Sequence, residues 1–213
     1  METTLHKTNT VESKSDQKII DEIRILRERV FAMYGVIRYK QERIKGEHAS
    51  ESVAEHIFSS IFLAELFLQL EGLEDKVDYK KIIRMLISHD LHEGITGDVL
   101  EAEQGDHLEA GELPAISLIS REFPLNIGDL VQMYKDKEKG LSLEGKFVQA
   151  IDKFQPLLWF FTDENIQMIR AINSREEIIS NQEKRNNLFK DFPIMLAYSK
   201  VIFEDLVRRG LLD

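Results

Sequence analysis

Residues 79–98, YKKIIRMLISHDLHEGITGD, decide the fold and hold the first indication of chemistry. Apolar side chains recur in their first half at three- and four-residue steps, the pattern of a helix with one buried face. We expect this helix to be Tyr79–Leu91, with Asp78 as its N-cap. The next position on the apolar stripe is Asp90. A carboxylate that faces a core costs on the order of several kcal/mol unless it is paired or binds a metal ion.

His89 comes directly before Asp90, so an imidazole and a carboxylate lie together at the predicted helix C-terminus. Both side chains can reach a single ion from there. The alternative interpretation is a capping aspartate beside a surface histidine. This segment alone is compatible with either.

The same periodicity predicts helices along most of the rest of the chain. Strand alternation flanked by turn pairs is absent. Charged residues without an apolar period predict a connector at 39–50, and Gly94, Gly97 and Gly105 predict a loop. We therefore expect an all-α fold, with a flexible tail at 1–15 and one domain at 16–213. The predicted helices are 16–35, 50–70 with Ser50 as N-cap, 79–91, 107–123, 127–137, 142–161, 163–180 and 192–211.

Composition narrows the class of protein. The chain has 213 residues, 28 Lys and Arg against 38 Asp and Glu, and a formal net charge of −10, which argues against binding duplex nucleic acid. It has no cysteine, which excludes disulfides, thiolate metal sites and cysteine nucleophiles. Residues 1–18 offer no apolar stretch for a secretory signal, and polar residues interrupt the apolar segment Ile57–Leu70. We expect a soluble, cytoplasmic protein without a membrane span.

Two further segments carry polar side chains among apolar ones. His56 lies beside an apolar stripe in residues 51–66, ESVAEHIFSSIFLAEL. Asp152 is surrounded by apolar residues in residues 144–161, EGKFVQAIDKFQPLLWFF. Taken singly, each has an ordinary interpretation: a histidine at the core boundary and a polar residue on a helix.

Joined in the order H…HD…D, the four residues resemble the HD-domain phosphohydrolase superfamily, and most closely its compact 5′-deoxynucleotidase branch. The matching stretches are SVAEH, HDLHEGITGD and EGKFVQAIDK, within about residues 36–161. The resemblance implies a helical domain in which four residues bind one divalent metal ion. Two histidines and two carboxylates suit Mn, Co, Fe, Ni or Zn. The implied ligands are His56, His89, Asp90 and Asp152.

The resemblance also implies roles for residues that follow the HD pair. Glu93 matches the position that orients or deprotonates the attacking water, and a carboxylate near a cation is a plausible general base. Asp98 matches a residue that contacts the sugar or supports the site, and Thr96 could donate a hydrogen bond nearby. His92 lies off the apolar stripe and is expected to be an outer or surface residue.

Arg38 and Tyr39 resemble the family's pair of an arginine and an aromatic residue, which clamps phosphate and flanks the nucleotide. The guanidinium fork suits phosphate, and the ring could stack on a base or ribose. The nucleotidases of this branch carry Trp where this chain has Tyr39. A second departure is the acidic segment 101–112, which would repel extra phosphates unless the basic residues 40–45 cover the pocket.

The predicted function is hydrolysis of deoxynucleoside 5′-monophosphates to nucleoside and inorganic phosphate. The expected partners are this small-molecule nucleotide substrate and, as the family suggests, a second copy of the chain in a homodimer. One alternative is a deoxynucleoside triphosphate triphosphohydrolase, which would need further cations such as those at 40–45. Another is a non-catalytic, metal-bound nucleotide sensor. An oxidative two-iron HD enzyme would need more histidine ligands, and His92 is the only spare nearby.

Overall fold

Helices account for almost all regular structure in the computed structural model, which describes residues 16–38, 51–98, 111–122 and 129–212, without the side chains of 163–165, 168 and 172. Within these ranges the one strand-like pairing is an isolated antiparallel bridge between Ile37 and Ser52. The predicted all-α fold is confirmed. The helices are α1 (Asp16–Gly35), α2 (Val53–Leu70), α3 (Tyr79–Ser88), α4 (Glu93–Thr96), α5 (Leu113–Glu122), α6 (Leu130–Lys139), α7 (Leu143–Trp159), α8 (Asp163–Ile172), α9 (Arg175–Leu188), a 3-10 turn (Phe189–Asp191) and α10 (Pro193–Arg208).

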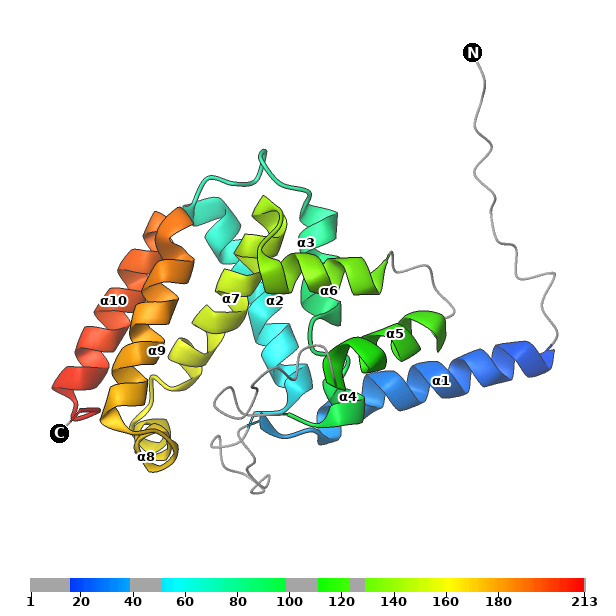
Figure 1. Cartoon of the computed structure of the whole chain (residues 1–213), viewed down its shortest axis with the longest axis horizontal. Helices are drawn as coiled ribbons and strands as arrows, with labels where there is room; N and C mark the ends of the chain where they lie inside the picture. Colours follow the sequence, from blue (N-terminus) through cyan, green and yellow to red (C-terminus); the bar gives the residue numbers. More distant parts are fainter. Residues whose placement is uncertain (1–15, 39–50, 99–110, 123–128, 213) are drawn as a thin grey trace, which may run out of the picture.

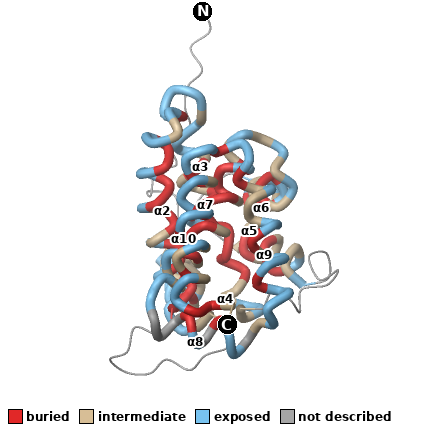
Figure 2. Tube along the Cα trace, turned by 90° about the vertical axis from the view of Figure 1, so that its left-hand side faces the viewer, coloured by how far each residue is buried: buried red, intermediate tan, exposed pale blue. Residues whose placement is uncertain are grey.

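Helices α2 and α7 pass through the middle of the molecule, with α9 and α10 on one side and α5 and α6 on the other (Figure 1). Helix α7 contacts α2, α3, α6, α9 and α10. Phe67 on α2 packs edge-on against Phe154 on α7, with ring centroids 4.7 Å apart. Figure 2 shows the buried positions gathered inside this bundle. The large core therefore forms around α7.

A second, smaller core lies between α1, α2, α5 and α6. It includes Met33, Val53, Ile57, Ile116 and Leu130, all of them buried. The N-terminal part of α2 belongs to this smaller core, and its C-terminal part belongs to the large core. His56 on α2 is fully buried between them.

The N-cap of α2 corrects one prediction. Ser52 caps the helix: its hydroxyl accepts a hydrogen bond from the Glu55 N–H, and the Glu55 carboxylate accepts one from the Ser52 N–H at 2.8 Å. This reciprocal capping box starts α2 at Val53. The predicted cap, Ser50, and the connector 39–50 lie outside the described residues.

Other boundaries also differ from the predictions. Asp78 caps α3 as expected, but the helix ends at Ser88, so His89 and Asp90 lie in the turn that follows. The predicted helix at 163–180 is two helices, because Ser174 forms a second capping box and starts α9 there. The remaining helices agree within a few residues, and the start predicted at 107 falls outside the described residues.

The loop predicted around Gly94 and Gly97 contains the short helix α4. A Cβ on Gly94 would lie 3.1 Å from the Cβ of Ala32, so the missing side chain lets α4 pack closely on α1. Gly97 ends α4 with a φ of +75°, a conformation that other residues rarely adopt. The two glycines thus turn the chain from Glu93 toward Asp98.

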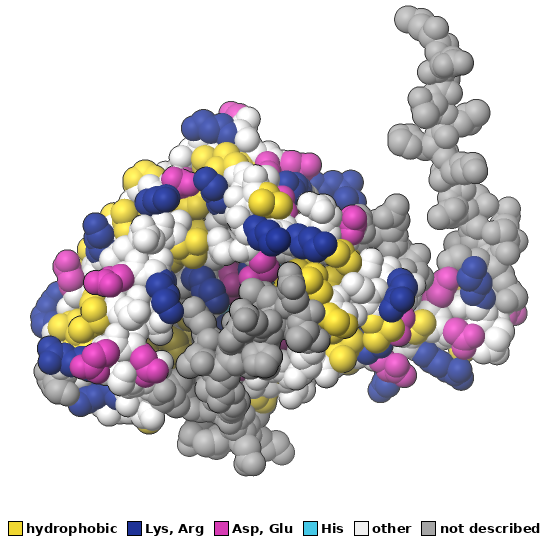
Figure 3. All heavy atoms as spheres, viewed as in Figure 1, with side chains coloured by type: hydrophobic (Ala, Val, Ile, Leu, Met, Phe, Trp, Pro, Cys, Tyr) yellow, Lys and Arg dark blue, Asp and Glu magenta, His cyan; other side chains and the backbone are white. Residues whose placement is uncertain are grey.

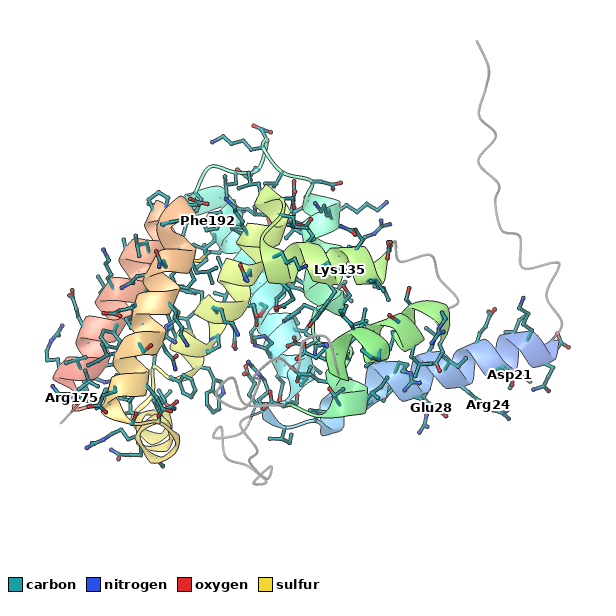
Figure 4. The ribbon with its side chains drawn as sticks, in the orientation of Figure 1. Asp21, Arg24, Glu28, Lys135, Arg175 and Phe192 are labelled. Atoms are coloured by element: carbon teal, nitrogen blue, oxygen red, sulfur yellow. The ribbon has the colours of Figure 1, made fainter. Side chains whose placement is uncertain are left out.

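The outer part of α1 extends beyond the other helices, with Asp21, Arg24 and Glu28 directed into solvent (Figure 4). On the face shown in Figure 3, acidic and basic side chains are interspersed. Helix α2 is the one described helix whose length and composition would suit a membrane span, and 44% of it is buried inside the fold. The helix is longer than the apolar segment Ile57–Leu70 considered in the sequence, because it begins at Val53.

Candidate metal centre

Four buried side chains from α2, α7 and the turn after α3 converge on one point: His56, His89, Asp90 and Asp152. One ligand atom from each lies within 4.8 Å of all the others. The Nε2 of His56 is 3.2 Å from Asp152 Oδ1, and the Nε2 of His89 is 3.1 Å from Asp90 Oδ2. These are the four residues that the resemblance names as ligands.

The hydrogen bonds of the two imidazoles suit a metal ion. Nδ1–H of His89 donates to the carbonyl oxygen of Leu86 at 2.7 Å, so Nε2 is the nitrogen directed at the cluster. Nδ1 of His56 faces two side chains, Oε1 of Gln155, an acceptor at 2.8 Å, and Nη1 of Arg38, a donor at 2.6 Å, while its Nε2 faces the cluster. The two Nε2 atoms face each other at 3.3 Å. Two imidazole nitrogens and two carboxylates directed at one point fit a borderline divalent ion.

The electrostatics of the cluster depend on close opposite charges. Burial would lower the pKa of His89, but Asp90 and Asp152 outweigh it and raise this pKa to about 10. Burial would raise the pKa of Asp152, but Lys137, Lys153 and the two histidines hold it well below its usual range. His89 likewise holds the pKa of Asp90 far below its usual range against the effect of burial. In the metal-free protein both aspartates are therefore ionised and His89 is protonated, so binding an ion there would release that proton.

Arg38 lies directly behind His56. The backbone bridge brings it there, because Arg38 N–H donates to the Glu51 carbonyl at 2.9 Å. Its Nη1 donates to the Glu51 carboxylate at 2.9 Å and lies 2.6 Å from Nδ1 of His56. Arg38 also lines the cavity described below. Tyr39, its predicted partner, lies outside the described residues.

Gln155 connects this group and was not predicted from the sequence. Its side-chain NH₂ donates to Glu51 Oε1 at 2.5 Å, while its Oε1 faces His56. The amide thus links the buried Glu51 carboxylate to a candidate metal ligand. The available signal was spacing: Gln155 follows Asp152 by one helical turn, on the same face of α7.

Glu93 and Asp98 both line the cavity beside Asp90. Oε2 of Glu93 is buried and has no hydrogen-bond partner among the described residues. Burial and the charges of Asp90 and Asp98 raise the pKa of Glu93 well above its ordinary value. Thr96 does not line this cavity; its hydroxyl donates to the carbonyl oxygens of His92 and Gly97.

His92 is buried, so the expectation of a surface residue is wrong, and of the two predicted alternatives only an outer residue of the site remains. Its ring packs edge-on against Tyr134, with centroids 5.8 Å apart, and its Nε2 is 3.8 Å from Glu112 Oε1. The Tyr134 hydroxyl donates to the other oxygen of Glu112. His92 therefore packs against Tyr134 of α6, lines the same cavity as Asp90, and is not one of the four clustered residues.

A cavity of about 490 Å³ opens from the cluster along α7 toward α9 and α10. Its polar end is lined by Arg38, Asp90, Glu93, Asp98 and Asp152. Apolar side chains of the C-terminal helices line the rest, together with polar groups of α9. This volume is in the range of small-molecule sites. The lining residues of the far end include Phe160, Ile178, Asn181 and Leu206.

Comparison with known proteins agrees with this geometry. Residues 38–190 match the family model of the HD domain. Over 126 residues the chain is 24% identical to 5′-deoxynucleotidase hdd1 of Schizosaccharomyces pombe, covering 56% of this chain and 61% of that protein. The chain thus spans less than two thirds of this relative's length.

Solved structures show the same fold. A predicted metal-dependent phosphohydrolase of Magnetospirillum magnetotacticum superposes with a TM-score of 0.73 at 21% identity, over 91% of this chain and 95% of that one. The PH0347 protein of Pyrococcus horikoshii gives a TM-score of 0.60 at 21% identity, over 86% and 99%. The fold is therefore all-α, and it carries a buried cluster of two histidines and two aspartates. The chain belongs to the HD domain family.

Proposed function

We propose that this chain hydrolyses deoxynucleoside 5′-monophosphates to nucleoside and inorganic phosphate. One observation carries the proposal: two aspartates of a cluster suited to a divalent ion line the same cavity as Glu93, whose buried Oε2 has no hydrogen-bond partner among the described residues. The similarity to a 5′-deoxynucleotidase supports the choice of substrate.

The residues of the site divide the chemistry among them. When bound, a divalent ion lowers the pKa of a coordinated water and offsets negative charge on phosphoryl oxygens. Glu93 accepts a proton from the attacking water as the new P–O bond forms. Because burial and neighbouring carboxylates raise its pKa, Glu93 is a stronger base than an exposed glutamate. The proton can return to the 5′ oxygen of the nucleoside when the original P–O bond breaks.

Arg38 is the cation that we assign to the phosphate. It lines the polar end of the cavity, and the Glu51 carboxylate holds the guanidinium in place from behind. A fixed guanidinium offers paired N–H donors to a phosphoryl group. We assign Asp98, at the mouth of the same polar end, to the sugar.

The same cavity argues for a monophosphate rather than a triphosphate. Beside the cluster, the charges of Arg38 and Lys137 are already paired with Glu51 and Asp152. A triphosphate would add several negative charges next to Asp90, Glu93 and Asp152. A triphosphohydrolase would therefore need other cations: Lys153, Lys184 and Arg185 line the cavity farther along, and the basic residues 40–45 lie outside the described part of the chain.

We further propose that the enzyme is a homodimer, with α2 in the interface. Phe58 and Phe62 are 73% and 69% exposed, and Leu66 and Leu70 continue the same face at one-turn intervals. An apolar stripe of this kind on a soluble protein marks an interaction site. In sedimentation analysis Phe62→Glu should convert a dimer into a monomer; a dimer unaffected by this change would place the interface elsewhere.

A phosphate-release screen tests the function. The chain is treated with chelator, reconstituted with Mn, Co, Mg or Zn, and given deoxynucleoside mono-, di- and triphosphates. The proposal predicts inorganic phosphate from monophosphates. Triphosphate released from a deoxynucleoside triphosphate would identify the alternative enzyme, and nucleotide binding without turnover would identify a sensor.

A further inference from the structure

Lys137 on α6 is a buried cation that the proposed mechanism leaves without a role. Its side chain is 9% exposed and lines the cavity beside the four candidate metal ligands. Its Nζ is 2.9 Å from Asp152 Oδ2 and 2.8 Å from Glu138 Oε1. Burial opposes the charge, but Asp152, Glu138 and Asp90 outweigh it and raise the pKa of Lys137 well above its usual value.

The two oxygens of Asp152 have different partners. Oδ1 faces the imidazoles, 3.2 Å from Nε2 of His56 and 3.7 Å from Nε2 of His89. Oδ2 turns the other way, to Lys137. Lys153 is 4.0 Å from the same oxygen and 40% exposed, so its hold on Asp152 is weaker. The carboxylate is therefore fixed with a single oxygen directed at the ligand cluster.

We propose that Lys137 is a positioning residue that holds Asp152 as a one-oxygen metal ligand. The proposal rests on the metal site of the proposed function. Without the ammonium group, the carboxylate is free to turn and present both oxygens to an ion, and a buried negative charge loses its partner. Groups that orient metal ligands are typically worth about 10–100-fold in metal affinity.

The chain contains a matched control, Lys81, which binds Asp136, the residue next to Lys137 on α6. Lys81 on α3 binds Asp136 Oδ2 at 2.8 Å and Glu144 Oε2 at 3.2 Å. It thus links α3 to α6 and α7, as Lys137 links α6 to α7, but Lys81 does not line the cavity. Loss of Lys81 should weaken helix packing without changing the metal site.

The test is a titration of cobalt(II) into chelator-treated protein, followed by calorimetry and by visible absorption. Lys137→Met should raise the cobalt Kd by roughly 10–100-fold and change the absorption spectrum, which reports coordination geometry. Lys137→Arg, which keeps the charge and the N–H donors, should stay nearer the wild-type Kd. Lys81→Met should lower the melting temperature and leave the Kd and the spectrum unchanged.

Each result has a definite meaning. A wild-type Kd and spectrum in Lys137→Met would overturn the proposal; a raised KM alongside them would make Lys137 a substrate cation instead. If Lys137→Met does not fold, Lys137→Gln replaces it, and an unchanged Kd there would equally overturn the need for the charge. If the wild-type chain binds no cobalt, the proposed function itself fails.

Discussion

Replacing Glu93 by Gln separates catalysis from binding. The substitution preserves the shape of the side chain but removes its negative charge and its capacity to accept a proton. Because Oε2 of Glu93 has no partner among the described residues, no described hydrogen bond is lost. The neighbouring carboxylates Asp90 and Asp98 repel the Glu93 charge, so removing it should not lower the melting temperature of the metal-free protein.

The expected loss is in turnover. A general base is worth about 10²–10⁴ in rate, or roughly 2.7–5.5 kcal/mol of activation free energy. Steady-state phosphate release should therefore show kcat reduced by that factor, with metal content and KM close to wild type. The acid limb that Glu93 imposes on the wild-type kcat profile, where protonation of the base abolishes activity, should disappear. A fully active Gln variant would refute proton abstraction at this position, and a loss confined to KM would make Glu93 a binding residue.

Four further changes test the surroundings of the site. Asp90→Ala should abolish metal binding while the helices still form, as elemental analysis and circular dichroism will show; metal retained at stoichiometric amounts would contradict the assignment. Chelation should lower the melting temperature, because an ion present at 100 times its Kd stabilises the fold by about 2.7 kcal/mol. Gln155→Leu should weaken metal binding about 10–100-fold in calorimetry, since His56 and Glu51 both lose a buried partner. Ser52→Ala should cost about 1 kcal/mol in urea unfolding through the lost cap of α2.

Local patterns in the sequence predicted most of the helices, because those helices have one apolar face and several have a recognisable start. Asp78 at the start of α3 is an example. The boundaries failed where a competing signal decided them. Ser52 and Glu55 outcompeted the predicted start at Ser50, and Ser174 divided a segment whose apolar period looks continuous.

The sequence correctly predicted that Asp90 is buried, but the helix position from which this was inferred is wrong. The sequence places it on the stripe of a continuing helix, whereas α3 ends at Ser88 and Asp90 is buried in the turn. Its neighbours, rather than helical phase, hold it there. The predicted apolar stripe of this helix included Tyr79 and Ile87, but both side chains are exposed. The buried face is therefore narrower than predicted.

Residues that support the site from a distance left little trace in the sequence. Lys137 belongs to a charged run, MYKDKEKG, that is typical of a solvated helix end. Only the packing of α6 on α7 buries it against Asp152. Arg38 was singled out for phosphate, but its contact with His56 depends on a backbone bridge between segments that no local pattern pairs.

The central claim is that one ion, held by His56, His89, Asp90 and Asp152, makes this chain a nucleotide phosphohydrolase. The most direct measurement is a titration of Mn or Co into chelator-treated protein, with phosphate release from a deoxynucleoside 5′-monophosphate recorded at each step. The account predicts no release without metal and activity that rises to a plateau at one ion per chain. Release that persists without metal, or full occupancy of the site with no release from any monophosphate, would contradict it.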